Sequence, residues 1–261
     1  MHFSIILPDV PIIVETFGHF SAFCLRCVLG FLEVFRRPSV FAVQLYRILQ
    51  GGLPLCATAG IAMGLVVWMH LREALRTVGG PSAVQALPQA LSLAVVMEFA
   101  PITSGLLIAG RTGASLGAEL GAMKLGEQID ALEVLGQSVI KELVVPRVLA
   151  CMFALPLLCL IIAYLAMLTG FIAELIGGTI GLRQYVNECL RNLVLREAIP
   201  ANLKTIVFGF LIGIIGCWNG LNTQGGTEGV GNAVTRAVVS SIFAVLISNV
   251  VLVRVIQFLT A

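Results

Sequence analysis

The amino-acid sequence predicts an all-α integral membrane protein with about five transmembrane helices. Of its 261 residues, 58% are hydrophobic and only 11% are charged, whereas soluble domains contain about 45–50% apolar residues. The mean hydropathy is +1.00. Long apolar runs recur along the chain, and a helix needs about 20 such residues to cross the hydrocarbon core of a bilayer. We therefore treat residues 1–261 as a single membrane domain.

The N-terminal residues 1–47 are predicted to form interfacial helices that precede the membrane bundle. Apolar residues recur at steps of three and four between Thr16 and Arg37, while His19, Arg26 and Glu33 form a polar stripe at seven-residue spacing. This pattern is typical of an amphipathic helix that lies in the membrane interface. A sixth, poorly apolar span is the alternative, but the charged residues of the stripe leave no full-length apolar run.

Five apolar segments are the predicted spans, and they form a transmembrane bundle over residues 48–261. They comprise residues 48–71, 77–110, 149–173, 205–221 and 237–253. Four of them lack charged residues, and the second contains only Glu98. With the N-terminus in the cytoplasm, nine of the 16 Lys and Arg residues fall on the cytoplasmic side. The positive-inside rule favours this orientation slightly and makes residues 111–147 cytoplasmic.

The second span combines an acid with a proline. Glu98 lies about midway along it, where insertion of a carboxylate costs about 2.5–3.5 kcal/mol. Pro101 has no backbone N–H, so the carbonyl of Met97 should lose its helical partner and the helix should be disturbed beside the acid. We predict that Glu98 and Pro101 mark a substrate cavity. A purely structural tie between Glu98 and another helix is equally compatible with the sequence.

Small residues indicate how the spans pack. Four glycines of the fourth span recur at steps of four, three and four, and they are Gly209, Gly213, Gly216 and Gly220. Membrane helices approach each other closely through such faces, so this stripe is predicted to serve helix packing. Gly60 and Gly64 of the first span form a GxxxG pair that could serve the same purpose or could be ordinary membrane-helix glycines.

The segment that follows the second span carries an acidic cluster. A helix of about nine or ten residues over 127–135, within a longer helical segment of about residues 119–136, would place Glu127, Asp130 and Glu133 within an arc of about 120°. Ile129, Leu132 and Leu135 would fall on the opposite arc. This helix is too short and too charged to span a membrane, so it should lie along the surface with its apolar side against the bundle. A solvated face without a partner is the alternative.

The motifs of soluble catalysis are absent from the sequence. It contains no GxxxxGK[ST] nucleotide-binding loop, no HExxH and no GxSxG. The three histidines, His2, His19 and His70, are too scattered to predict a metal cluster. We therefore expect no catalytic residues, no metal site and no cofactor in this chain.

Two long blocks of the sequence resemble the MlaE/YrbE family, the permease subunits of ABC lipid transporters. The first is "EFAPITSGLLIAGRTGASLGAELGAMKLGEQIDALEVLG" and the second is "KTIVFGFLIGIIGCWNGLNTQGGTEGVGNAVTRAVVSS". With the five spans, the resemblance covers most of residues 40–260. One departure is that Met97 precedes Glu98, where the family commonly has an arginine.

The resemblance implies a lipid transporter with several subunits. The chain would be a multi-pass permease of the Gram-negative inner membrane, paired with a second copy of itself and with a dimer of cytoplasmic ATPase subunits that bind ATP and Mg. A periplasmic MCE-domain protein would exchange phospholipid with it and maintain the lipid asymmetry of the outer membrane. The acidic segment would be the coupling helix, and the residues implied in coupling to the ATPase are Arg111, Glu119, Glu127, Asp130 and Glu133.

Two other function classes remain open at this stage. An ion-coupled secondary transporter should carry several intramembrane ionisable groups and internal repeats, whereas the sequence shows one intramembrane acid and no clear repeat. A membrane-embedded lipid-modifying enzyme would need a nucleophile or an acid–base pair at one depth, and the sequence indicates none.

Overall fold

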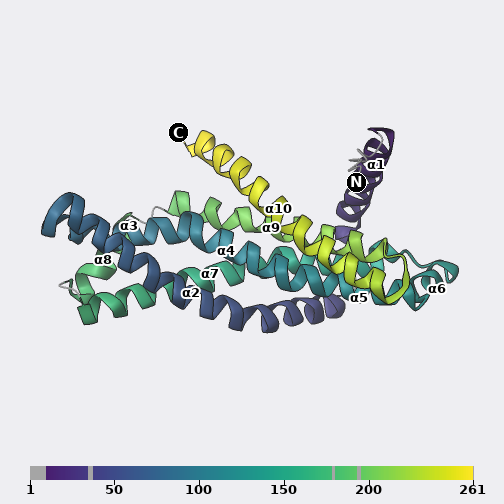
Figure 1. Cartoon of the computed structure of the whole chain (residues 1–261), viewed down its shortest axis with the longest axis horizontal. Coiled ribbons are helices and arrows are strands. Elements are labelled where there is room, and N and C mark those ends of the chain that lie inside the picture. The colour runs from purple at the N-terminus through teal and green to yellow at the C-terminus, as the bar shows by residue number, and fades with distance from the viewer. Residues whose placement is uncertain (1–9, 35–37, 178–179, 193–194, 261) are drawn as a thin grey trace, which may run out of the picture.

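A computed structural model describes residues 10–34, 38–177, 180–192 and 195–260 of the chain (Figure 1). The described residues form helices and no strands. Five helical stretches are long and apolar enough to cross a membrane, namely Pro38–Gly80, Val84–Leu125, Ile140–Gly177, Ala198–Leu221 and Gly226–Phe258. The all-α class and the five spans are thereby confirmed. Each stretch is longer than its predicted span, because the helices continue into charged flanking residues.

The chain order of the helices is simple except in the second span. The α-helices are α1 (Val10–Val34), α2 (Pro38–Ala83), α3 (Leu87–Ala94), α4 (Ala100–Ile108), α5 (Ala114–Leu125), α6 (Gln128–Val134), α7 (Val145–Gly177), α8 (Leu182–Asn192), α9 (Leu195–Leu221) and α10 (Gly226–Thr260). The second span begins with the short 3₁₀ turn η1 (Val84–Ala86) and contains two π-helical segments, η2 (Val95–Phe99) and η3 (Ala109–Gly113). A third π segment, η4 (Ile140–Val144), leads into α7.

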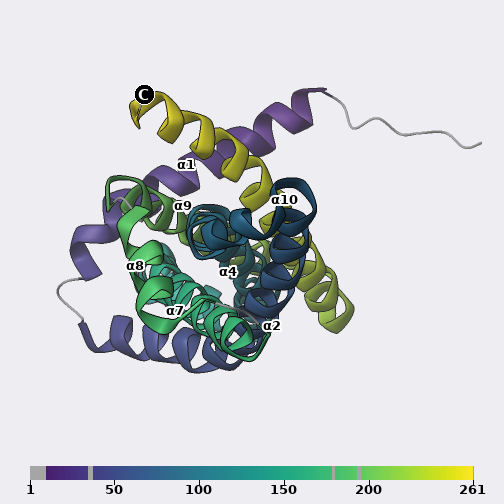
Figure 2. The same ribbon diagram turned by 90° about the vertical axis from the view of Figure 1, so that its left-hand side faces the viewer.

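Helix α1 runs across the direction of the bundle instead of along it (Figures 1 and 2). Its apolar part, Gly18–Phe31, is shorter than the five spanning stretches. Phe23 and Cys27 of this helix are buried, and the Phe23 ring lies 5.3 Å from the Trp218 ring of α9. These contacts support an interfacial helix docked on the bundle. Residues 38–47 belong to the same helix as the first span, α2, and the division of the chain at residue 47 stays a prediction.

The spanning helices pack around α7 and α9. Helix α2 lies along α7, α9 lies between α7 and α5, and α10 covers α9 and α5. Figure 1 shows α6 at one end of this bundle and α8 at the other, and we refer to them as the α6 end and the α8 end. Fully buried Ile108, Leu158 and Phe208 belong to the central core. A second core that includes Val148 and Ile214 lies against α1.

The glycine stripe of α9 is divided between two neighbouring helices. A Cβ atom at Gly209 would lie 2.6 Å from the carbonyl oxygen of Cys151 in α7, and Gly213 also faces α7. A Cβ atom at Gly220 would lie 2.7 Å from the Leu120 Cβ of α5, and Gly216 faces the same helix. The stripe therefore lets the backbone of α9 approach α7 and α5 at once. Gly60 and Gly64 of α2 have the same relation to the backbone of α7.

We expect Gly209→Ala to lower the free energy of unfolding by about 1–3 kcal/mol, the usual range for overpacking. The added methyl group would meet the backbone of Cys151 and Met152, which cannot move aside as a side-chain tip could. Thermal unfolding of the purified protein in detergent measures the loss. Gly231→Ala in α10 is the control, because a Cβ atom there meets no described atom within 4 Å. Equal stability of both variants and the parent would contradict the close contact between α7 and α9.

Candidate functional site

Three helices bring polar side chains together inside the apolar bundle. The Lys204 Nζ of α9 lies 3.1 Å from the Glu98 Oε2 of η2. The Asn249 Nδ2 of α10 donates to the same carboxylate oxygen at 3.3 Å. The side chain of Lys204 is 1% exposed and that of Glu98 is 39% exposed. The group therefore has a buried cation and a carboxylate that can be reached from outside the single chain.

The disturbance predicted beside Glu98 is present and has a polar partner. Because Pro101 cannot donate to Met97, the carbonyl of Met97 is available, and Lys204 Nζ donates to it at 2.8 Å. The helix at this point takes the π-helical form of η2, which ends just before α4. Lys204 therefore holds both the acid and the irregular backbone next to it.

The two cavity residues predicted in the second span differ in their exposure. Pro101 is buried, and its carbonyl accepts a hydrogen bond from Ser104 Oγ at 2.8 Å. Pro101 thus shapes the helix without lining an exposed surface of the single chain. Asn249 is also buried, and its Oδ1 is a buried acceptor beside Glu98 without a hydrogen-bond donor among the described residues.

A second polar group lies nearer the α8 end. The Glu174 carboxylate of α7 is fully buried, lies 3.5 Å from Arg72 Nη1 and accepts a hydrogen bond from Trp68 Nε1 at 2.9 Å. Sequence reasoning missed this group because both charges stand one residue outside the predicted spans 48–71 and 149–173. One signal was available in the sequence. The first and third predicted spans end on the same side of the membrane, and the residues that follow them, Arg72 and Glu174, have opposite charges.

The acidic segment folds as two helices, and the predicted continuous helix over 119–136 is wrong. Helix α5 ends at Leu125, and Glu127 adopts a left-handed conformation with φ of 55° before α6 begins. Glu127 therefore does not share a helical arc with Asp130 and Glu133. Asp130 forms an ion pair with Lys124 of α5 across this turn, and Glu133 is exposed.

The apolar side of α6 is only partly covered. Ile129 is 3% exposed and Leu132 is half-buried, as expected for residues that face the bundle. Leu135 departs from that expectation, because it is 73% exposed beside Val134, which is 89% exposed. The α6 end thus presents carboxylates and two large apolar side chains on one short segment, a composition suited to contact with another protein.

The remaining coupling candidates lie away from α6. Glu119 is near the middle of α5, where its Oε2 lies 3.4 Å from the Arg147 Nη2 at the start of α7. Arg111 belongs to η3 and lines a pocket together with residues of α2. The structure therefore separates the five candidates into two places, because Arg111 and Glu119 line the same pocket and the other three lie at the α6 end. Their contact with an ATPase stays a prediction.

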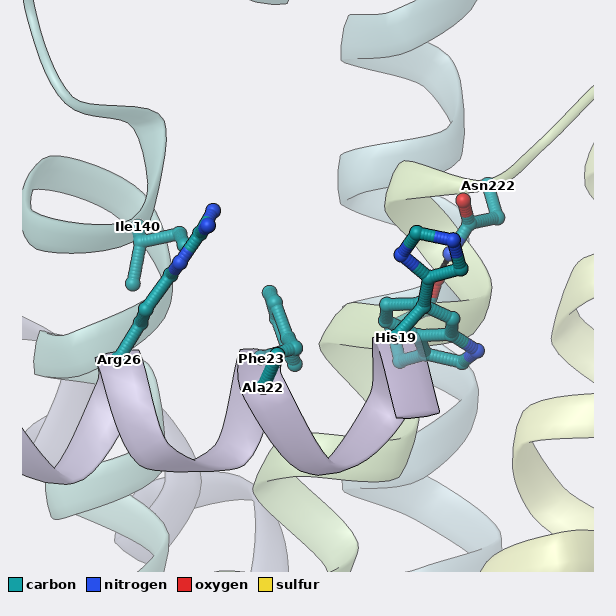
Figure 3. A pocket seen from close by; sticks show the side chains of 7 residues that line it. His19, Ala22, Phe23, Arg26, Ile140 and Asn222 are labelled. Carbon is teal, nitrogen blue, oxygen red and sulfur yellow. Dashed lines mark hydrogen bonds between the residues drawn. The ribbon is translucent and has the colours of Figure 1, made fainter. Parts of the chain in front are cut away.

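Another pocket lies beside the contact between α1 and the bundle (Figure 3). His19, Phe23 and Arg26 rise from one side of α1, and Ile140 and Asn222 lie opposite them. Two residues of the predicted polar stripe, His19 and Arg26, therefore border this pocket. Among the described residues, no group of three or more His, Cys, Asp and Glu side chains is placed to hold a metal ion.

Comparisons with known proteins agree with this architecture. The family model described as Permease MlaE matches residues 41–255. A probable ABC transporter permease protein of Rickettsia bellii is 32% identical over 238 residues, which cover 90% of both chains. One from Synechocystis is 37% identical over 193 residues, covering 74% of this chain and 73% of the relative. The chloroplastic protein TRIGALACTOSYLDIACYLGLYCEROL 1 of Arabidopsis thaliana is 37% identical over 163 residues, covering 62% of this chain and 46% of the relative.

Proposed function

Because this chain belongs to the MlaE permease family, we propose that it is the membrane-spanning subunit of an ATP-driven transporter that moves phospholipid. The observation that carries the proposal is the polar group of Glu98, Lys204 and Asn249 inside the bundle. Ionisable groups at such a depth are costly and typically mark a transport path. The chain itself is a non-enzymatic permease, and ATP and Mg are bound by a separate ATPase subunit.

The polar group has the chemistry to receive a phospholipid headgroup. Glu98 can attract a cationic headgroup such as an ammonium, Lys204 can attract a phosphate, and Asn249 Oδ1 can accept a hydrogen bond. In the present arrangement Lys204 and Glu98 satisfy each other. An entering headgroup would exchange these internal contacts for contacts with the lipid, so the two side chains satisfy each other while no lipid is bound.

The outer surface of the bundle supports assembly with a second copy. Helix α10 exposes a row of large apolar side chains, which includes Phe243, Ile247, Val250 and Phe258. We assign part of this face to a second permease chain, so that two polar groups would border one lipid cavity. We place this dimer in the Gram-negative inner membrane, with a periplasmic MCE-domain protein as the lipid acceptor or donor that maintains outer-membrane asymmetry.

We assign ATPase contact to the α6 end, on the cytoplasmic side. Glu127, Asp130 and Glu133 would meet basic residues of the ATPase, and exposed Val134 and Leu135 would enter an apolar groove. The Glu119–Arg147 pair then links the helix that leads to α6 with the first turn of α7. Movement of α6 would therefore be transmitted to the second span through α5 and to the third span through α7.

Replacement of Glu98 tests the transport site. In proteoliposomes that contain the chain, its ATPase and fluorescent phospholipid, we expect Glu98→Ala to lower ATP-dependent lipid transfer while assembly stays intact. Glu98→Gln keeps the shape and hydrogen bonding, so it separates the role of charge from that of hydrogen bonding. Parental transfer by Glu98→Ala would exclude Glu98 from the lipid path. Transfer that is driven by an ion gradient without ATP would refute the proposed function as a whole.

A further inference from the structure

A polar pocket of about 240 Å³ lies between α2 and the η3–α5 region. It is lined by Gln44, Arg47 and Ile48 of α2 and by Arg111, Thr112, Ser115, Leu116 and Glu119 of the second span. Two guanidinium groups therefore border one small space. This pocket is separate from the polar group around Glu98. Arg111 stands 13 residues further along the chain than Glu98, which is about 20 Å at 1.5 Å per residue.

The backbone of α2 makes room for one of these guanidinium groups. A Cβ atom at Gly51 would collide with the Arg111 Nη1. The glycine therefore allows the Arg111 side chain to lie across α2 toward the pocket. Arg111 also belongs to the π-helical segment η3, and such segments frequently occur at functional sites.

The positive charges of the pocket are not neutralised by its single acid. Among the described residues, neither Arg47 nor Arg111 has a carboxylate within ion-pair distance. Glu119 lies 3.4 Å from Arg147 Nη2 and accepts a hydrogen bond from Ser115 Oγ at 3.4 Å. Its charge is therefore directed toward a third arginine, and the pocket keeps an excess of positive charge.

The two arginines stand at the same end of two neighbouring apolar runs, which we take as one edge of the hydrocarbon layer. Arg47 directly precedes residues 48–71 and Arg111 directly follows residues 77–110. The 24 residues of the first stretch measure about 36 Å as a helix, close to the hydrocarbon thickness of about 30 Å. If these charges mark the end of the hydrocarbon layer, the pocket stands at the level of the lipid phosphates.

We propose that this pocket binds the phosphate of a glycerophospholipid, at a site separate from the Glu98 group. The two guanidinium groups supply charge-assisted hydrogen bonds, for which phosphate is a preferred acceptor. Gln44, Thr112 and Ser115 offer further polar contacts to the glycerol or headgroup. Because the pocket has excess positive charge, it favours lipids with a net negative charge over zwitterionic lipids. The site does not depend on transport or on the ATPase.

Lipid binding by the purified chain tests this inference. Native mass spectrometry would compare retention of phosphatidylglycerol with that of phosphatidylcholine, and a parallel titration would use inorganic phosphate. We expect Arg47→Gln and Arg111→Gln each to weaken phosphatidylglycerol binding about tenfold. Gly51→Ala keeps both charges but displaces the Arg111 guanidinium, so it should also weaken binding while the unfolding temperature without lipid is unchanged.

Arg236→Gln is the matched control, because Arg236 is exposed on α10 and bonds only weakly to its own helix at 3.4 Å. Its phosphatidylglycerol binding should equal that of the parent. An equal loss in this control would show diffuse attraction and would overturn the proposal, as would unchanged binding in the Arg47, Arg111 or Gly51 variants. If inorganic phosphate displaced phosphatidylglycerol at equal concentration, the pocket would be a site for free phosphate and the proposal would be overturned. If the Arg47 and Arg111 variants bound lipid normally but no longer co-purified with the ATPase, the pocket would be a contact site for the ATPase.

Discussion

Replacement of Lys204 with methionine is expected to destabilise the protein by about 1–3 kcal/mol, the cost of leaving buried polar groups without partners. The carbonyl of Met97 would lose its donor and Glu98 would lose its cation. Methionine has a similar length, so the loss would come from the missing charge and hydrogen bonds instead of from a cavity. The Asn249 Nδ2 would still donate to Glu98, so the carboxylate would keep one polar partner. Thermal unfolding in detergent measures the effect, and lipid transfer should fall in the same variant.

An exposed ion pair provides the control for this prediction. Lys124→Met removes the partner of Asp130 on the surface, where such pairs contribute about 0–1 kcal/mol. The double variant Glu98→Gln/Lys204→Met should be less destabilised than the sum of the two single variants, because the two residues share one interaction. Additive effects, or a Lys204→Met variant as stable as the parent, would show that the contact does not stabilise the bundle.

Reversal of the three acids at the α6 end is expected to abolish recovery of the ATPase with the permease. In the variant with Glu127, Asp130 and Glu133 replaced by lysine, like charges would face the basic surface that we propose on the ATPase. Such juxtaposition costs several kcal/mol, and each 1.4 kcal/mol is tenfold in affinity. The isolated permease should lose no more than about 0.5 kcal/mol at each of the exposed residues Glu127 and Glu133, and about 0–1 kcal/mol at Asp130, which pairs with Lys124. Co-purification and unfolding temperature measure the two effects separately.

Glu228→Lys is the corresponding control for the coupling prediction. Glu228 is an exposed acid in the first turn of α10, and this turn lies near the end of α5, since Gly121 packs toward Val230. Its reversal should leave ATPase recovery unchanged. Full recovery and full transport in the triple variant would refute contact through these carboxylates, whereas equal losses in both variants would indicate only a general effect of charge at this end.

The spans were predictable from the sequence because their physical cause is local. Each span needs a long apolar run, and such runs can be counted along the chain. The ends were less predictable, because a helix can leave the hydrocarbon and continue in water. The sequence-based prediction begins the first and fourth spans directly after the charged residues Arg47 and Lys204. The structure places both residues inside the spanning helices, α2 and α9.

The partners of Glu98 could not be predicted, because a single sequence does not show which helices are neighbours. The proline rule did indicate a free carbonyl at Met97, but it could not identify Lys204 as the donor. The turn at Glu127 was missed for a different reason. The three-residue spacing of the acids fits one continuous helix, and a left-handed residue other than glycine has only a weak sequence signal.

The two π-helical segments set the rotational phase of the second span. A π turn contains about one residue more than an α turn, so the side chains beyond it are turned by about 100° around the axis. If η2 returned to α-helical winding, Arg111, Glu119 and the whole of α5 would rotate relative to α3. The bond from Lys204 to Met97 opposes that change from outside the span. Torque applied at the α6 end would therefore act on a bond that belongs to the proposed lipid site. A bound headgroup that drew Lys204 away from Met97 would release the same rotation.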